Sequence, residues 1–185
     1  MTRMKSNMSQ LLIIDIQDKV LATIPSKQTI VENSLRLIRA ANMLQVPITV
    51  SEQYPQGLGL TLEPLKDVLD SNASFFEKLH FSCMRDNILQ HHRQDHRDSG
   101  RGQVIVAGIE AHVCVMQTVL DLIADGFEVY VIADATGSRA ESSKALAMRR
   151  MDKTGAFIAD TEMVIFEWLE RAGTPEFKPL QALIK

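Results

Sequence analysis

The chain has 185 residues, 45% of them hydrophobic, and a formal net charge of −3 at pH 7. That size predicts one domain over residues 1–185 with a substantial core, and the scattered basic residues argue against nucleic-acid binding. No run approaches the roughly 20 apolar residues of a membrane helix, and the apolar run 11–14 is too short for a signal peptide, so we expect a soluble cytoplasmic protein.

Apolar β-rich runs alternate with helical patterns along almost the whole chain. The first half predicts strands at 11–16, 48–50 and 75–77, each followed by a helix, at 30–44, 62–69 and 84–92. The second half predicts strands at 104–107, 129–133 and 156–159, followed by helices at 113–124, 141–154 and 162–172. This alternation favours a parallel sheet covered on both faces. We predict an α/β three-layer sandwich with a six-stranded parallel sheet in the order 3-2-1-4-5-6.

The cysteines and histidines do not have metal-site spacing. Cys83 and Cys114 lie far apart without a C-x-x-C motif, which argues against a disulfide framework and a structural zinc. Cys83 has apolar neighbours and is interpreted as buried filler. The polar segment 90–102 contains three histidines and is interpreted as a frayed helix end and solvated loop.

Three reactive side chains follow predicted strands. Asp15 ends the first strand, Lys78 follows the third and Cys114 follows the fourth. Because ligands bind at the carboxyl ends of parallel strands where the strand order reverses, these side chains are expected to converge. Each residue also has an ordinary explanation, since such an aspartate is often a cap, such a lysine is usually solvated and a free cysteine is usually buried.

The predicted place of Cys114 at the start of a helix favours a thiolate, because the helix dipole lowers the pKa of a nearby thiol. Asp15 is a base for that thiol only if desolvation raises its pKa, and Lys78 would hold this pKa down. In this arrangement Asp15 takes the thiol proton and Cys114 attacks a carbonyl carbon. The N–H of Cys114 and another from the turn 109–111 would hold the oxyanion.

The motifs LLIID at 11–15, FFEK at 75–78 and GIEAHVC at 108–114 resemble those of the isochorismatase-like cysteine hydrolases. That resemblance covers nearly the whole chain and implies an Asp15, Lys78 and Cys114 triad. It also implies a non-proline cis peptide at Ile109–Glu110 that aims an N–H at the oxyanion. The segments EQYPQGLG at 52–59, ADA at 133–135 and EFK at 176–178 are similar to the subgroup called isochorismatase domain-containing proteins.

Two departures from the family limit what the resemblance implies. Nicotinamidases of this family hold a metal through aspartate and histidine after the second strand, whereas residues 51–57 here contain no histidine. We therefore expect no metal and no cofactor, and nicotinamide is not the expected substrate. True isochorismatases do not depend on a nucleophilic cysteine, so the reaction that names the family is not expected either.

Other residues are candidates for binding a small molecule or a second subunit. Gln17, Gln53, Tyr54 and His112 lie on the same carboxyl-end loops and could orient a small polar substrate, or serve only as walls. The apolar positions at 164–169 and 177–184 indicate core or subunit contact, which favours a homo-oligomer: a dimer, tetramer or higher.

The leading hypothesis is a metal-independent hydrolase that cleaves an amide-type C–N bond of a small molecule through a Cys114 thioester. The alternative is a catalytically idle scaffold or regulatory binding protein that retains the fold. A nucleotide-dependent oxidoreductase would need a glycine-rich turn after the first strand, and residues 14–19 contain no glycine.

Overall fold

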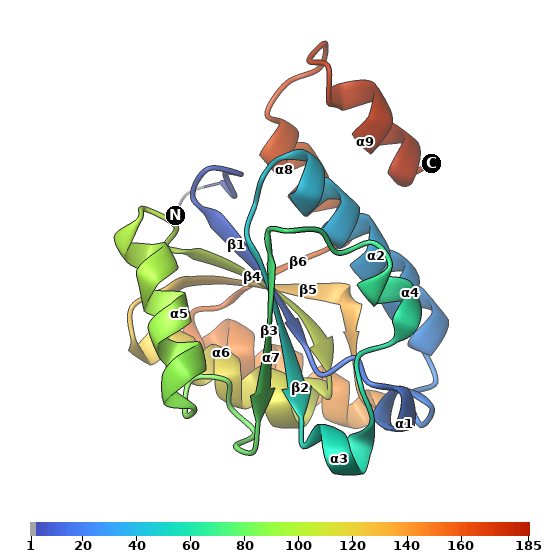
Figure 1. The fold of residues 1–185 in the computed structure, drawn as a ribbon, viewed down its shortest axis with the longest axis vertical. Helices are drawn as coiled ribbons and strands as arrows, with labels where there is room; N and C mark the ends of the chain where they lie inside the picture. Colours follow the sequence, from blue (N-terminus) through green and yellow to red (C-terminus); the bar gives the residue numbers. More distant parts are fainter. Residues whose placement is uncertain (1–2) are drawn as a thin grey trace.

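The computed structural model describes residues 3–185, with Ile88 described by its backbone only. Its centre is a six-stranded parallel sheet in the predicted order, β3-β2-β1-β4-β5-β6 (Figure 1). The strands are β1 (Ser9–Ile14), β2 (Ile48–Gln53), β3 (Ala73–Lys78), β4 (Gln103–Ile109), β5 (Glu128–Gly137) and β6 (Phe157–Ala159). Strand order therefore reverses between β1 and β4, which pair along their whole length.

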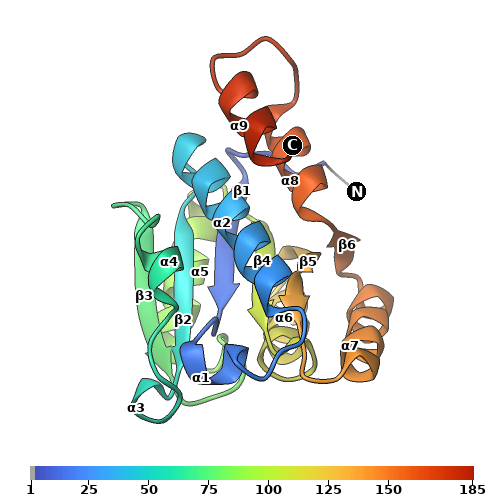
Figure 2. The ribbon, with the colours of Figure 1, turned by 90° about the vertical axis from the view of Figure 1, so that its right-hand side faces the viewer.

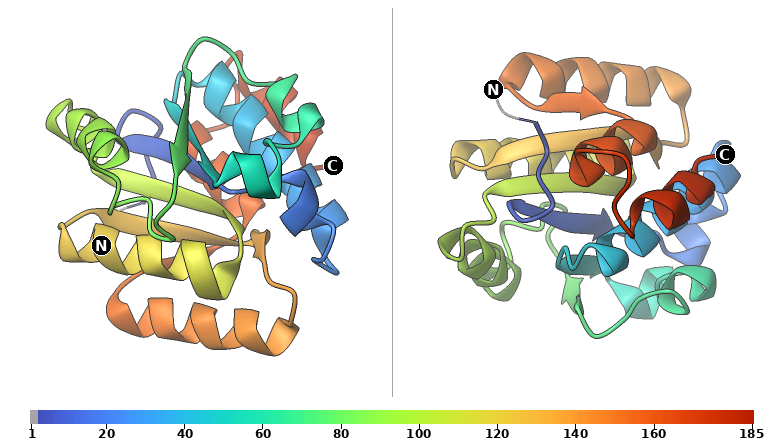
Figure 3. Two further views of the ribbon diagram at one scale, coloured as in Figure 1. Left: turned by 60° about the horizontal axis from the view of Figure 1, so that its bottom comes forward. Right: turned by 90° about the horizontal axis from the view of Figure 1, so that it is seen from above.

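Helices cover both faces of the sheet and give two separate cores (Figure 3). One layer contains α5 (Asn87–Asp98), α6 (Met116–Ala124) and α7 (Glu141–Thr154). The opposite layer contains α2 (Lys27–Met43), α4 (Glu63–Lys66), α8 (Thr161–Leu169) and α9 (Phe177–Leu183). Two short helices, α1 (Asp18–Leu21) and α3 (Pro55–Leu58), lie at the carboxyl ends of the strands (Figure 2). Alternate side chains of the parallel strands enter each core, which is why these strands are apolar on both faces.

The interpretation of 90–102 as a frayed helix end and loop was wrong, because α5 continues to Asp98. Some of its polar residues contact the sheet, and others face solvent. The His92 ring packs 4.7 Å from the Phe76 ring centroid, and its Nε2 lies 3.1 Å from the Thr49 hydroxyl. Tertiary contacts to β2 and β3 therefore stabilise a helix whose composition resembles that of a loop.

Arg93 of α5 is fully buried, and no carboxylate contacts it among residues 3–185. One Nη donates to the Thr49 hydroxyl, while Nε and the other Nη have no partner. Burial lowers the pKa of Arg93 to about 9, so the group is still charged at neutral pH. A buried charge without an ion partner destabilises the folded state.

Replacing this cation with an apolar side chain should stabilise the protein. For Arg93→Met we expect the free energy of unfolding to rise by about 1–4 kcal/mol, because a similar volume is kept and the desolvated charge is removed. Urea denaturation at neutral pH measures the change, with Arg149→Met on the exposed face of α7 as the control. A clear loss of stability in Arg93→Met alone would mean that the guanidinium has a partner that compensates its burial.

The carboxyl-terminal segments belong to the core. Trp168 is buried and its Nε1 donates to the Ser9 hydroxyl at 3.0 Å, while Leu180 is fully buried against the α2 layer. The sequence left open whether their apolar positions serve core packing or subunit contact, and the structure shows core packing within one chain. Within the described part of the chain, no helix is both long enough and apolar enough to span a bilayer.

Candidate active site

The carboxyl ends of β1 and β4 are brought close together by one glycine. Gly108 pairs with Ile14 in the parallel ladder and has a φ of +133°. A Cβ atom at this position would collide with the backbone oxygen of Ile14, so only glycine allows the approach. The next residues on the two strands are Asp15 on one side and the turn that carries Cys114 on the other.

Asp15 and Lys78 form a buried ion pair. Lys78 Nζ donates to Asp15 Oδ2 at 2.7 Å, and both side chains are almost fully shielded from solvent. Lys78 also donates to Gln53 Oε1 at 2.7 Å and to the backbone oxygens of Phe81 at 3.1 Å and His80 at 3.3 Å. Four acceptors around one ammonium group compensate much of the penalty of burying it.

Cys114 lies in a π-helical turn (Ala111–Val115) that precedes α6, not in the first turn of an α-helix as predicted. The Val115 N–H donates five residues back to the Glu110 oxygen at 3.2 Å. The Ile109–Glu110 peptide bond before this turn is cis, as the resemblance implied. Short π-helical segments occur often at functional sites.

Cys114 is 7% exposed, and its thiol lies close enough to Asp15 for each group to shift the pKa of the other. Asp15 therefore contacts Lys78 directly and lies near Cys114, which places the three strand-end residues singled out in the sequence in one region of the structure. This arrangement places a carboxylate base, an ammonium group and a thiol within one buried cluster.

The proton affinities of the cluster differ from the expected ones. Burial raises the pKa of Asp15 despite the opposing charge of Lys78. Burial and the Asp15 charge raise the pKa of the Cys114 thiol, so the predicted thiolate is wrong for the resting protein. Burial works against the Lys78 charge, but attraction to Asp15 and the two thiols leaves its pKa raised. These shifts favour a charged Lys78 and a neutral Cys114 thiol in the resting protein.

The turn that carries Cys114 is tied to neighbouring elements. Glu110 Oε2 accepts from the Arg139 backbone N–H at 2.9 Å and from Arg139 Nε at 3.1 Å, which joins the turn to the segment after β5. Thr118 Oγ1 donates to the Cys114 oxygen at 2.7 Å and accepts from the Cys83 N–H at 3.0 Å. These bonds hold the nucleophile turn against both flanking loops.

The four tentative substrate residues divide into two groups. The Gln17 amide is used within the protein: Oε1 accepts from the Gln53 N–H at 2.8 Å, and Nε2 donates to the Gln53 and Gly59 oxygens. The Gln53 amide is also engaged, with Lys78 and with the Leu79 oxygen. Tyr54 is exposed and His112 is half-buried, so these two remain better candidates for contact with a substrate.

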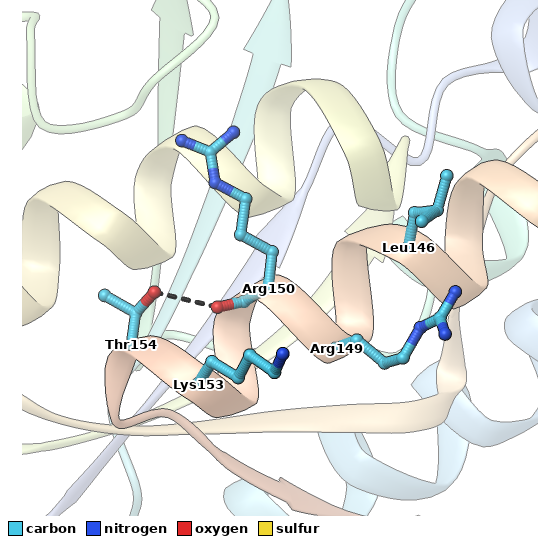
Figure 4. A pocket seen from close by; sticks show the side chains of 5 residues that line it. All are labelled: Leu146, Arg149, Arg150, Lys153 and Thr154. Atoms are coloured by element: carbon cyan, nitrogen blue, oxygen red, sulfur yellow. Dashed lines mark hydrogen bonds between the residues drawn. The ribbon is translucent and has the colours of Figure 1, made fainter.

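A surface hollow of about 330 Å³ lies beside this cluster. It is lined by Tyr54, Pro55, Gln56, Glu77, Lys78, Leu79 and Asp86. A second hollow, of about 390 Å³, lies on the outer side of α7 and is lined by Leu146, Arg149, Arg150, Lys153 and Thr154 (Figure 4). Only the first hollow includes a residue of the Asp15, Lys78 and Cys114 cluster. Its volume is within the range of small-molecule pockets.

Among residues 3–185, no group of three or more His, Cys, Asp or Glu side chains is arranged to hold a metal ion. The end of β2, where a metal was considered, presents Ser51, Glu52 and Gln53. Glu52 Oε1 accepts from the Thr61 N–H at 2.7 Å, and the amide of Gln53 holds Lys78.

Sequence reasoning missed three residues of the cluster: Ser51, Cys83 and Thr118. Ser51 Oγ donates to Asp15 Oδ1 at 2.7 Å, and the Cys83 thiol donates to Ser51 Oγ at 3.6 Å. Ser51 could have been found from the sequence, because it falls near the end of β2 and pairs with Ile14, directly before Asp15. Cys83 was interpreted as buried filler, and it is fully buried, but it also makes this polar contact.

Comparisons by sequence and by structure both find relatives that align with most of this chain. The family model named isochorismatase domain matches residues 9–163. Isochorismatase family protein 1B of Dictyostelium discoideum is 37% identical over 179 residues, covering 96% of this chain and 86% of that protein. Isochorismatase domain-containing protein 2 of Macaca fascicularis is 36% identical over 177 residues, covering 96% and 83%. A solved structure described as the MAR1 ribonuclease of Caenorhabditis elegans is 37% identical with a TM-score of 0.92, covering 99% of this chain and 92% of that one.

Proposed function

Because the chain belongs to the isochorismatase family, we propose that it is a metal-independent cysteine hydrolase that cleaves an amide-type C–N bond of a small molecule. Membership of this family supports a hydrolase in general. The choice of a covalent cysteine mechanism rests on one observation, the proximity of the Cys114 thiol to the buried Asp15 carboxylate that is paired with Lys78.

The proposed reaction begins with a neutral thiol. Asp15 takes the thiol proton as Cys114 Sγ attacks the carbonyl carbon, so the charge on sulfur never builds up in the buried site. Backbone N–H groups of Cys114 and of the turn 109–111 hold the oxyanion. Collapse of the tetrahedral adduct breaks the C–N bond, and Asp15 returns the proton to the departing amine. The products of this half are the amine and a Cys114 thioester.

Water completes the cycle. Asp15 takes a proton from water as the water oxygen attacks the thioester carbonyl, the carboxylic acid leaves, and the proton passes back to the Cys114 sulfur. Lys78 keeps Asp15 ionised between these transfers, because its charge opposes the effect of burial on the Asp15 pKa. The net reaction consumes one amide and one water and yields one acid and one amine.

A panel of small primary and secondary amides tests this proposal through the release of ammonia or amine. We expect turnover by the wild-type protein, none by Cys114→Ala, and wild-type turnover by Ser142→Ala at the exposed start of α7. Dialysis against a chelator should leave the rate unchanged. A rate that falls on chelation and returns with added metal, or turnover that survives Cys114→Ala, contradicts the proposal.

If no amide is turned over, the scaffold alternative gains support. It would be favoured if Cys114→Ala and Asp15→Asn both preserved every measurable cellular role of the protein.

The similarity to a structure described as a ribonuclease raises a second test. Arg149, Arg150 and Lys153 of α7 are exposed cations around the hollow in Figure 4 and are the group best placed to attract phosphates. Against this, the whole chain has a net charge of −3. We expect no binding of single-stranded RNA at physiological salt, measured by fluorescence anisotropy. RNA cleavage that disappears in Cys114→Ala would replace the amide with RNA as substrate.

We also infer a homo-oligomer, now for a different reason from the one given by the carboxyl-terminal pattern. Several large apolar side chains are exposed on a single chain, including Leu79 at 71%, Leu146 at 61% and Phe81 at 54%. Exposed apolar groups of this size often mark subunit contacts. Light scattering after size-exclusion chromatography should give more than one subunit, and a monomer at micromolar concentration would contradict the inference.

A further inference from the structure

The two oxygens of Asp15 are held by different partners. Oδ2 accepts from Lys78 Nζ, and Oδ1 accepts from Ser51 Oγ, both at 2.7 Å. Ser51 is fully buried, and its backbone oxygen also accepts from the Asp15 N–H at 3.1 Å. Oδ2 thus accepts from a charged donor, the Lys78 ammonium, while Oδ1 accepts from the neutral Ser51 hydroxyl.

A serine hydroxyl has one proton to donate, and its lone pairs can accept. The Cys83 thiol donates to Ser51 Oγ at 3.6 Å, which leaves the single Ser51 proton directed at Asp15. Cys83 is itself fully buried, and its backbone N–H donates to Thr118 Oγ1 at 3.0 Å. The thiol donates to a hydroxyl, and its other neighbours include Thr118 and apolar side chains.

We propose that Ser51 and Cys83 are positioning residues for the reaction: the Cys83 thiol fixes the Ser51 hydroxyl as a donor, and Ser51 holds Asp15 in the orientation that receives the Cys114 proton. The effect on turnover rests on the proposed function. The effect on Asp15 itself does not, because it depends only on the bonds from Ser51 and Cys83.

The charges around Asp15 give this chain of bonds a measurable consequence. Asp15 is faced by the Lys78 ammonium from β3, the Cys114 thiol from the π-helical turn, the Ser51 hydroxyl from β2 and the Cys83 thiol beyond it. Burial raises the Asp15 pKa, and the bond from Ser51 lowers it by favouring the ionised form. Without the Ser51 hydroxyl, burial still raises the Asp15 pKa, and one hydrogen bond that lowered it is lost. The Asp15 carboxyl group is therefore harder to ionise.

Carbon NMR of labelled aspartate carboxyl groups tests the proposal without a substrate, with the Asp15 signal assigned from Asp15→Asn. For Ser51→Ala we expect the Asp15 pKa to rise by about one unit, the size of a lost hydrogen bond to a charged group. For Cys83→Ala we expect a smaller rise in the same direction. Ser34→Ala removes a fully buried hydroxyl of α2 that lies outside this chain of bonds, and it should leave the Asp15 titration unchanged.

The double variant decides whether Cys83 acts through Ser51. Cys83→Ala should add nothing to the shift once Ser51 is alanine, because the hydroxyl that it orients is gone. An Asp15 titration that Ser51→Ala does not move, or fully additive shifts, would overturn the proposal. With an active substrate, the acid limb of kcat/KM should move by the same amount in Ser51→Ala. If the NMR shift is found but no substrate is turned over by any variant, the positioning chain stands and the proposed hydrolase fails.

Discussion

Asp15→Asn should abolish hydrolysis while making the Cys114 thiol easier to alkylate. Hydrolysis needs a carboxylate that takes the thiol proton and returns it to the amine, so turnover should fall by at least about 100-fold. Alkylation needs only the thiolate. Burial and the Asp15 charge both raise the pKa of Cys114, and removing that charge leaves Lys78 to stabilise the thiolate. Each unit of decrease in the thiol pKa raises the thiolate fraction about tenfold.

Iodoacetamide at neutral pH measures this effect, with the modified residue located by peptide mass spectrometry. Cys83 is an internal control in the same sample, because it is fully buried and should stay unmodified in the folded protein. Slower alkylation of Cys114 in Asp15→Asn than in the wild type would show that Asp15 activates the resting thiol, which the raised thiol pKa argues against.

Lys78→Met should be the most destabilising single change in the cluster. It leaves the Asp15 carboxylate buried without its counter-ion and removes the donor from Gln53, Phe81 and His80. Breaking a buried ion pair by removing one partner costs about 3–5 kcal/mol in the free energy of unfolding. Chemical denaturation of Lys78→Met measures this loss. Lys66→Met, which breaks the exposed ion pair between Lys66 and Glu63, is the control and should change the free energy of unfolding little.

The pH dependence of Lys78→Met follows from the Asp15 pKa. That pKa is raised in the folded wild-type protein above its ordinary value of 3.8, and loss of Lys78 raises it further. A group with a raised folded pKa stabilises below its unfolded pKa, and this contribution is lost as pH rises through the folded pKa. The loss of stability should therefore be smaller near pH 4 than at neutral pH. Adding Asp15→Asn should restore much of it, and a double variant as unstable as Lys78→Met would contradict the buried-pair explanation.

The sequence was sufficient for the sheet order and for the prediction that Asp15 and Lys78 lie together, with Cys114 nearby. Alternating strands and helices restrict the topology, and parallel strands bring their carboxyl ends to one edge. Local residue patterns carry this information, because a buried parallel strand and an amphipathic helix each have a distinct period.

What the sequence did not reveal depends on contacts between distant residues. The helical state of α5 depends on His92 and Arg93, which face β2. Composition alone predicts a solvated loop for this segment. The extra residue in the turn 111–115 changes a predicted α-helix into a π-helical turn without any distinctive residue type. The raised pKa of Cys114 depends on the burial of that turn and on the nearby Asp15 charge, neither of which is visible in the local sequence.

Mass spectrometry of the protein mixed rapidly with an amide that it hydrolyses, and then quenched in acid, tests the covalent role of Cys114 most directly. We expect an added acyl mass on the peptide that contains Cys114 and none on Cys83. Neutral hydroxylamine should release that mass, and Cys114→Ala should form no adduct. Substrate turnover by the wild-type protein with no acyl mass on Cys114, together with turnover retained by Cys114→Ala, would contradict a covalent role for Cys114.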